Sequence, residues 1–150
     1  MFVLIVGCGR VGASLARKML GEGHTVSCLD QNPEAHAKLG VGLAGEWEDD
    51  GGIFTVGAAL ETEALETAGI EKADAFVAAT NGDNTNIVIA QIAQKKYDVD
   101  RVVARILDPA RAHFYRERGM EIVCPTRVAI EMLEQSLLGS GSTTGSGTCT

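Results

Sequence analysis

The feature that most constrains this chain is the stretch FVLIVGCGRVG near its N-terminus. A short apolar run there meets three glycines, Gly7, Gly9 and Gly12, in the spacing G-x-G-x-x-G. A segment with helical apolar periodicity follows, and then a second apolar run at 25–29 that ends in Asp30. The order of strand, glycine turn, helix, strand and acid is typical of a nucleotide-binding βαβ unit.

Each glycine of this turn has a separate expected role. Gly7 lets the chain turn sharply off the strand, Gly9 leaves room for a phosphate to approach the backbone, and Gly12 lets the helix pack closely. The free amides and the positive dipole end of the helix then face the phosphate. Asp30 lies 18 positions after Gly12, near the usual spacing for an acid that binds ribose hydroxyls.

The residues around the turn also favour some ligands over others. Asp30 would repel a 2′-phosphate, and Gln31 after it supplies no cation, so NADP is disfavoured relative to NAD(H). Arg10 stands inside the turn, where its guanidinium can make bidentate contacts to phosphate. The alternative is a solvated arginine at a helix start, which opposes the local dipole in the absence of an anion.

Composition excludes several classes of protein. The 150 residues suit one domain, and the net charge of −7 argues against a nucleic-acid partner. No apolar run approaches the roughly 20 residues that span a bilayer, and no signal peptide is evident. The cysteines form no C-x-x-C pair, so we predict no metal ligands. The acids at 46–50 are interpreted most simply as a solvated surface, with a metal site as the less supported alternative.

Strand and helix patterns alternate along the whole chain. Further strands are predicted at 53–56, 75–79, 101–106 and 121–124, with helical segments between them. This alternation predicts a doubly wound, Rossmann-like α/β fold, with a parallel sheet of order 3-2-1-4-5-6 and helices on both faces. Ligands of such sheets bind at the carboxyl ends of the strands, at the switch point between strands one and four.

Helix starts can be predicted from capping residues. Asn32 before Pro33 and Asp108 before Pro109 are typical cap-and-proline starts. Asp83 and Thr126 are predicted to cap the fourth and the last helix. The sequence from Gly139, GSGSTTGSGTCT, is predicted to be a flexible linker or a cloning remnant, which leaves residues 1–138 as the domain.

Catalytic motifs are missing from this pattern. Neither Tyr97 nor Tyr115 is followed by lysine in the Tyr-x-x-x-Lys spacing of short-chain reductases, and no substrate domain follows. A binding module is therefore favoured over an enzyme. A small NAD-dependent oxidoreductase, or a fragment of one, remains the alternative, and a purely structural module is a third possibility.

Several spaced blocks form a more specific pattern than the glycine turn alone. They are GCGRVG at 7–12, the acid at 30, EALETAGIEKADAFVAAT at 63–80, GDNTNI at 82–87, RVVARI at 101–106 and GMEIVCPT at 119–126. Together they resemble the N-terminal domain of the TrkA/KtrA type, the RCK or KTN domain, over about residues 1–138. This family regulates potassium channels and transporters.

The resemblance implies a non-enzymatic, cytosolic regulatory subunit at the inner face of the membrane. It implies binding of NAD(H), ATP, ADP or AMP, assembly into dimers or rings of dimers, and gating of a membrane-embedded potassium channel or transporter. The last helix, 126–138, resembles the crossover helix that leads to a second lobe. The family usually has a polar residue where this chain has Ala58.

The site residues that the resemblance implies fall into four groups. Phosphates are assigned to Gly7, Gly9, Arg10, Val11 and Gly12; the ribose to Asp30 with Gln31; the adenine side to Gly57, Ala58 and Ala59; and the far wall to Thr80, Asn81 and Arg105.

Overall fold

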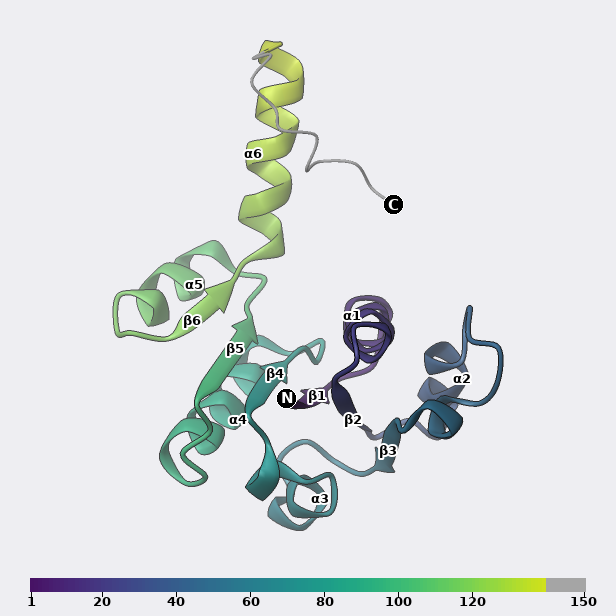
Figure 1. The fold of residues 1–150 in the computed structure, drawn as a ribbon. Helices are drawn as coiled ribbons and strands as arrows, with labels where there is room; N and C mark the ends of the chain where they lie inside the picture. The colour runs from purple at the N-terminus through teal and green to yellow at the C-terminus, as the bar shows by residue number, and fades with distance from the viewer. Residues whose placement is uncertain (140–150) are drawn as a thin grey trace.

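A computed structural model describes residues 1–139 of the chain. Its six strands form one parallel sheet in the order β3-β2-β1-β4-β5-β6, which confirms the predicted topology (Figure 1). The strands are β1 (Phe2–Val6), β2 (Thr25–Asp30), β3 (Ile53–Val56), β4 (Ala75–Ala78), β5 (Arg101–Arg105) and β6 (Glu121–Val123). The order reverses between β1 and β4, so the switch point lies at the centre of the sheet.

Helices cover both faces of the sheet. They are α1 (Arg10–Gly21), α2 (His36–Leu39), α3 (Thr62–Thr67), α4 (Asp83–Lys95), α5 (Pro109–Arg116) and α6 (Pro125–Leu138), with short 3-10 turns η1 (Pro33–Ala35), η2 (Trp47–Asp50) and η3 (Ile70–Lys72). One buried cluster joins α1, α2 and η2 to the sheet, and a larger one joins α3, α4 and α5 to the opposite face.

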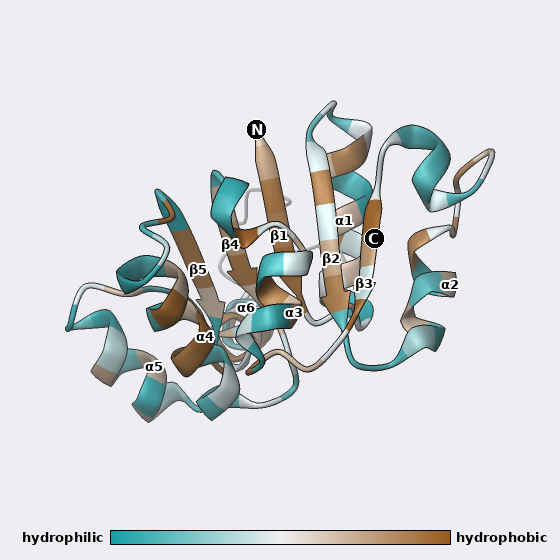
Figure 2. Ribbon diagram, turned by 90° about the horizontal axis from the view of Figure 1, so that it is seen from below, coloured by the Kyte–Doolittle hydropathy of each residue, from teal (hydrophilic) through white to brown (hydrophobic). Residues whose placement is uncertain are grey.

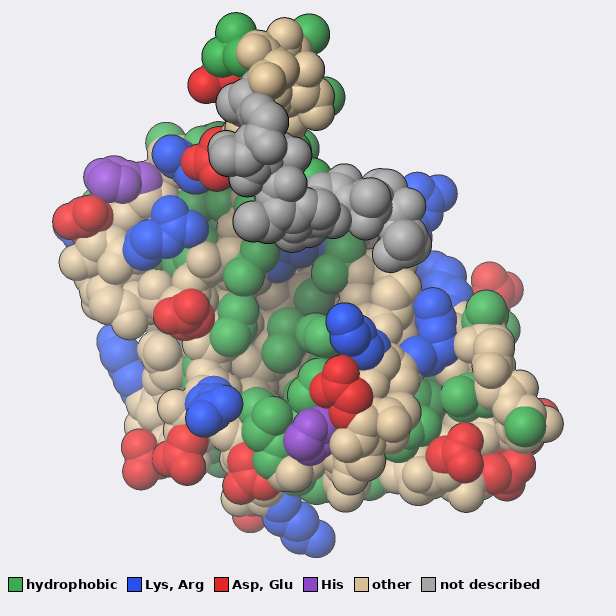
Figure 3. All heavy atoms as spheres, turned by 45° about the horizontal axis from the view of Figure 1, so that its top comes forward, with side chains coloured by type: hydrophobic (Ala, Val, Ile, Leu, Met, Phe, Trp, Pro, Cys, Tyr) green, Lys and Arg blue, Asp and Glu red, His purple; other side chains and the backbone are tan. Residues whose placement is uncertain are grey.

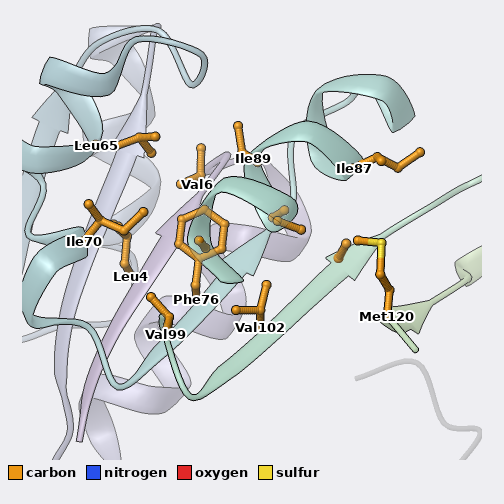
Figure 4. Packing of buried hydrophobic residues seen from close by; sticks show 14 of the residues in the cluster. Leu4, Val6, Leu65, Ile70, Phe76, Ile87, Ile89, Val99, Val102 and Met120 are labelled. Carbon is orange, nitrogen blue, oxygen red and sulfur yellow. The ribbon is translucent and has the colours of Figure 1, made fainter. Parts of the chain in front are cut away.

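Apolar residues are concentrated in the central strands, as the hydropathy colouring shows (Figure 2). In the larger cluster Phe76 of β4 is fully buried, with Leu4 and Val6 of β1 and Ile89 of α4 in the same cluster (Figure 4). Burying a side chain of this size contributes about 1.5–3 kcal/mol. The sheet edge that carries the loops after β1 and β4 is therefore held by a rigid core.

Two of the four predicted helix caps are present. The side chain of Asn32 accepts a hydrogen bond from the backbone N–H of Glu34 (3.0 Å), and that of Asp108 accepts one from Arg111 (3.1 Å). The prediction for Asp83 was wrong, because Gly82 is the N-cap of α4 and the Asp83 carboxylate turns to another loop.

Other differences concern the start of the last helix and the side chains that face inward. Thr126 does not cap α6, which begins one residue earlier, at Pro125, with Cys124 as the N-cap. In α4, Val88 is exposed, whereas the neighbouring Ile89 is fully buried. Within the expected acidic loop Trp47 is also fully buried, so this segment is anchored to the core.

The last helix stands apart from the rest of the domain. Figure 1 shows α6 projecting away from the sheet, and within residues 1–139 none of its side chains is buried. Across that same range we find no helix with the length and apolarity that a bilayer crossing requires. Of the predicted tail, residues 140–150 lie outside the described residues.

Candidate functional site

A cavity of about 520 Å³ opens at the carboxyl ends of β1, β2, β3 and β4. Its volume is in the range typical of small-molecule sites. Of the residues predicted from the sequence, those that line it are Gly7, Gly9, Asp30, Gln31, Gly57, Ala58, Ala59, Thr80 and Asn81. The fold thus brings loops from four strands to the place where the topology predicts a ligand.

Four predicted residues do not line this cavity. Arg10, Val11 and Gly12 form the first turn of α1 behind the glycine loop, and Arg105 ends β5 on the far side of β4. Arg10 is exposed at the helix start. The structure therefore separates the predicted set into a wall of loop residues and a supporting group around it.

The glycine turn is shaped by close contacts at two of its three glycines. Gly7 has a φ of +98°, and a Cβ built on it would lie 2.5 Å from the carbonyl oxygen of Ala79 after β4. A Cβ on Gly12 would lie 1.8 Å from the carbonyl oxygen of Gly7. Side chains are therefore excluded at both positions, because Gly7 touches the backbone after β4 and Gly12 touches the backbone of Gly7.

Gly9 differs from the other two glycines. No described atom lies within 4 Å of a Cβ built on it, and the residue lines the cavity. It is also the N-cap of α1, where no side chain of the described residues makes a capping hydrogen bond and no acid lies in the first turn. Since the first amides of a helix need partners, this open helix end can receive an anion.

Asp30 links the glycine turn to the loop after β2. Its carboxylate accepts hydrogen bonds from the backbone N–H of Cys8 (2.8 Å) and of Asn32 (2.9 Å). A carboxylate has about four lone-pair positions, so it can still accept hydrogen bonds from ribose hydroxyls. Asp30 thus has a structural role that sequence spacing alone did not reveal, beside the binding role that its place in the cavity allows.

The opposite wall is held by a residue that the sequence analysis missed. Asn86 of α4 is 1 % exposed, and its Oδ1 accepts hydrogen bonds from the backbone N–H (2.9 Å) and the hydroxyl (2.6 Å) of Thr80. Its Nδ2 donates to the carbonyl oxygens of Thr80 (3.0 Å) and Arg105 (2.8 Å). The sequence signal that could have identified Asn86 is an amide side chain directly before the apolar run of α4.

Arg105 and Asp83 complete this wall. Arg105 donates from Nη2 to the carbonyl oxygen of Thr80 (2.8 Å), while its Nε is buried without a hydrogen-bond partner among the described residues. The Asp83 carboxylate accepts from the backbone N–H groups of Leu107 (2.8 Å) and Asp108 (3.0 Å). These contacts tie the loops after β4 and β5 together.

Lys38 was also missed by the sequence analysis. It lies in α2 and lines the cavity together with Asp30. The backbone carbonyl of Lys38 accepts a hydrogen bond from Arg17 of α1, which attaches α2 to the neighbouring helix. A basic residue on the helix after the second strand is a signal that the sequence did contain.

The two cysteines beside the turn are structural. Cys8 and Cys28 are both fully buried, and the Cys8 thiol contacts the carbonyl oxygen of Leu29 (3.8 Å). A hydrogen bond with Cys8, together with burial, raises the pKa of Cys28 far above its usual range. A thiol that stays protonated is a poor nucleophile, so we assign Cys28 to packing.

The sheet order and the cavity at the switch point define a Rossmann-type α/β domain. The chain belongs to the TrkA-N domain family, whose model matches residues 3–125. This confirms the resemblance noted in the sequence, and the family is one of regulatory domains rather than of enzymes.

Individual proteins show the same relationship. The chain is 38% identical over 142 residues to the "Trk system potassium uptake protein TrkA" of Streptomyces coelicolor, covering 95% of this chain and 60% of that protein. The chain thus spans about three fifths of the length of this curated relative.

Solved structures have the same fold. The "Kef CTD in AMP bound form" of Shewanella denitrificans superposes with a TM-score of 0.73 at 25% identity, covering 96% of this chain and 84% of that one. The "GsuK channel bound to NAD" gives a TM-score of 0.74 at 21% identity, covering 94% of this chain and 24% of that one.

Proposed function

We propose that this domain binds NAD(H) or an adenine nucleotide (ATP, ADP or AMP) in the cavity, and that occupancy regulates potassium transport. The observation that carries the proposal is the open start of α1 at Gly9, facing the same cavity as the Asp30 carboxylate. One surface is suited to phosphate and the other to ribose hydroxyls, and a nucleotide has both groups.

In this proposal the ligand lies across the ends of the strands. Its phosphates approach the backbone at Gly9, its ribose hydroxyls donate to Asp30, and its adenine lies beside the loop Gly57–Ala59. Thr80 and Asn81 form the facing wall. The Kef domain, solved with AMP, supports this class of ligand.

Two cations bear on the choice among ligands. Arg10, at the exposed start of α1, is proposed to reach the terminal phosphates, so its loss would weaken ATP more than AMP. Asp30 disfavours the 2′-phosphate of NADP, although Lys38 on the same cavity wall offsets part of that repulsion. We therefore expect NADP to bind more weakly than NAD.

Calorimetry with NADH, NAD, ATP, ADP and AMP tests the proposal, with Asp30→Ala as the variant. Asp74→Ala is the matched control, because Asp74 also accepts a backbone N–H, that of Phe2 (2.7 Å), at the opposite edge of the sheet. We expect Asp30→Ala to lower affinity at least about tenfold, or about 1.4 kcal/mol, and Asp74→Ala to leave affinity unchanged. Thermal unfolding of both variants separates lost stability from lost contacts.

The result that would overturn this part is no binding of any of the five nucleotides by the folded protein. Equal affinity of wild type and Asp30→Ala would remove Asp30 from the site. Turnover of NADH with a simple carbonyl substrate would favour the oxidoreductase alternative.

The regulatory part of the proposal rests on the relatives. Proteins named for potassium uptake match over nearly the whole of this chain, which supports a cytosolic role beside a membrane-embedded potassium channel or transporter. Nucleotide occupancy would bias the relative positions of packed domains, and that bias would gate the pore.

Self-association is part of the same proposal. α6 carries exposed apolar side chains, which are Val128, Ile130, Leu133, Leu137 and Leu138. Figure 3 shows hydrophobic side chains around this projecting helix, at the top of the view. An apolar helix face of this kind favours a homo-oligomer, a dimer or a ring of dimers, and sedimentation with and without nucleotide measures it.

A further inference from the structure

A group of potential metal ligands lies in α2 and η2, in the segment between β2 and β3. His36 begins α2, while Glu46 and Glu48 flank the start of η2. One ligand atom from each of the three residues lies within 4.8 Å of the others. His36 Nε2 and Glu48 Oε1 are already 2.6 Å apart.

The backbone and the imidazole of this group are held in place by the surrounding structure. The His36 ring makes an edge-on contact with the ring of Phe54 in β3, with 5.4 Å between centroids and an interplanar angle of 66°. Trp47, between the two glutamates, is fully buried and donates its indole N–H to the carbonyl oxygen of Ile53 (3.1 Å). The backbone N–H of Glu46 donates to the Asp49 carboxylate (2.9 Å).

The local charge favours a cation. Glu46 and Glu48 bring two carboxylates to one imidazole, and Asp49 and Asp50 follow directly in the chain. Like charges this close repel each other, and a divalent ion between them would reverse that cost. The sequence interpretation of a solvated acidic surface took no account of His36, which is ten residues before Glu46 and is brought to it by the fold.

We propose that His36, Glu46 and Glu48 bind one divalent transition-metal ion of the zinc class, with water completing a tetrahedral shell. An imidazole nitrogen with two carboxylate oxygens is a ligand set that zinc accepts, whereas Mg²⁺ and Ca²⁺ prefer oxygen ligands throughout. Zinc–ligand bonds of about 2.1 Å place ligand atoms about 3.4 Å apart. The 2.6 Å pair of His36 and Glu48 must therefore widen slightly, which a small rotation of the exposed Glu48 side chain allows. This site is separate from the nucleotide proposal, and either can fail alone.

A zinc titration in competition with a chromophoric chelator tests the proposal. It is carried out on the Cys149→Ser protein, so that a thiol outside the described residues cannot contribute. We expect one Zn²⁺ per chain, unaffected by excess Mg²⁺. His36→Gln removes the nitrogen ligand and should lower affinity by more than the roughly 10- to 100-fold that loss of an outer-shell partner costs.

His113→Gln is the matched control. His113 is another helical histidine beside a glutamate, since its Nε2 lies 3.9 Å from Glu117 Oε1, but it is outside the group of three. We expect this variant to bind zinc as the parent does. A Co²⁺ spectrum gives a second measurement, because nitrogen and oxygen ligands produce visible bands without the thiolate charge-transfer band that a cysteine site adds.

Three results would overturn the proposal. They are no stoichiometric zinc binding by the parent, equal affinity of the parent and His36→Gln, or a thiolate band in the Co²⁺ spectrum. Glu48→Gln, which keeps the shape of the side chain, should weaken zinc binding in the same direction as His36→Gln. Circular dichroism of each variant confirms that the fold is intact.

Discussion

The helices α1 and α4 begin at the same edge of the sheet, after the adjacent central strands β1 and β4, yet their N-termini differ. Both have glycine as the N-cap, Gly9 in α1 and Gly82 in α4. In α1 the first turn contains no acid, whereas α4 begins with Asp83. The chain thus places two helix dipoles side by side and neutralises one of them.

At the start of α4, polar side chains of the first turn bind the neighbouring loops. Asp83 and Asn86 of α4 bind backbone groups of the loops after β4 and β5, so these polar groups are satisfied internally. At α1 the corresponding space beside Gly9 is left open to the cavity. Neither N-cap makes a side-chain hydrogen bond, so the comparison teaches that the acid in the first turn, and not a cap, distinguishes the two helix ends.

The largest effect is expected from a substitution that distorts the open start of α1. Gly12→Ala places a Cβ 1.8 Å from the carbonyl oxygen of Gly7, and backbone cannot move aside as a flexible side chain can. We expect a loss of more than about 3 kcal/mol in the free energy of unfolding, measured by urea denaturation. Gly21→Ala, near the other end of α1 with no described atom within 4 Å, is the control and should not destabilise the protein.

A Gly12→Ala protein with near-normal stability would show that α1 can move away from the turn. The contact between turn and helix would then not define the geometry of the open end.

The glycine turn is also where sequence reasoning was most successful. The alternation of patterns fixed the topology, because parallel strands joined by right-handed crossovers leave few arrangements. The spacing predicted a sharp turn at Gly7, an open position at Gly9 and close packing at Gly12, and the φ of Gly7 and the contacts of the other two agree. The roles of the glycines could be predicted because the G-x-G-x-x-G spacing belongs to one short turn.

The hydrogen-bond partners of the polar side chains at the start of α4 could not be predicted in the same way. Asp83 was expected to cap its own helix, but its carboxylate accepts from Leu107 and Asp108, more than twenty positions away. Asn86 likewise bonds to Arg105, 19 positions later. A polar side chain near a helix start has several possible partners, and only the packed loops decide among them. Lys38 and His36 depend on the fold for their neighbours in the same manner.

The second prediction concerns the start of α4, where Asn86 binds the neighbouring loops. Asn86→Ala removes hydrogen bonds from the part-buried backbone N–H of Thr80 and carbonyl oxygen of Arg105, and each unsatisfied group costs about 1–3 kcal/mol. We expect a loss of about 3 kcal/mol in the free energy of unfolding, by the same denaturation measurement.

Asn84→Ala is the control on the same helix. Asn84 is exposed and accepts a hydrogen bond from Arg111 (2.8 Å), so its loss should change stability by less than about 0.5 kcal/mol. If the two asparagine variants were equally stable, the hydrogen bonds of Asn86 at the start of α4 would contribute nothing measurable to stability. The difference between the two helix ends would then have no energetic basis.

The last prediction has the smallest effect on the protein and bears most directly on the comparison. Gly9→Ala adds a methyl group where no described atom lies within 4 Å, so stability should change by less than about 1 kcal/mol. The methyl group occupies the place where a phosphate would approach the amides of α1. We therefore expect nucleotide affinity, measured by calorimetry, to fall about tenfold, or about 1.4 kcal/mol.

Gly82→Ala is the matched change at the N-cap of α4. Its built Cβ meets Thr85 Oγ1 at 3.4 Å, an ordinary contact, so this variant should also fold. If the ligand's phosphate sits at α1 alone, Gly82→Ala keeps the wild-type affinity. If both variants lose affinity equally, the phosphate bridges the two helix ends, and the carboxylate of Asp83 does not close α4 to anions. Unchanged affinity in Gly9→Ala would place the phosphate elsewhere in the cavity, because a methyl group at its predicted point of contact cannot be tolerated without cost.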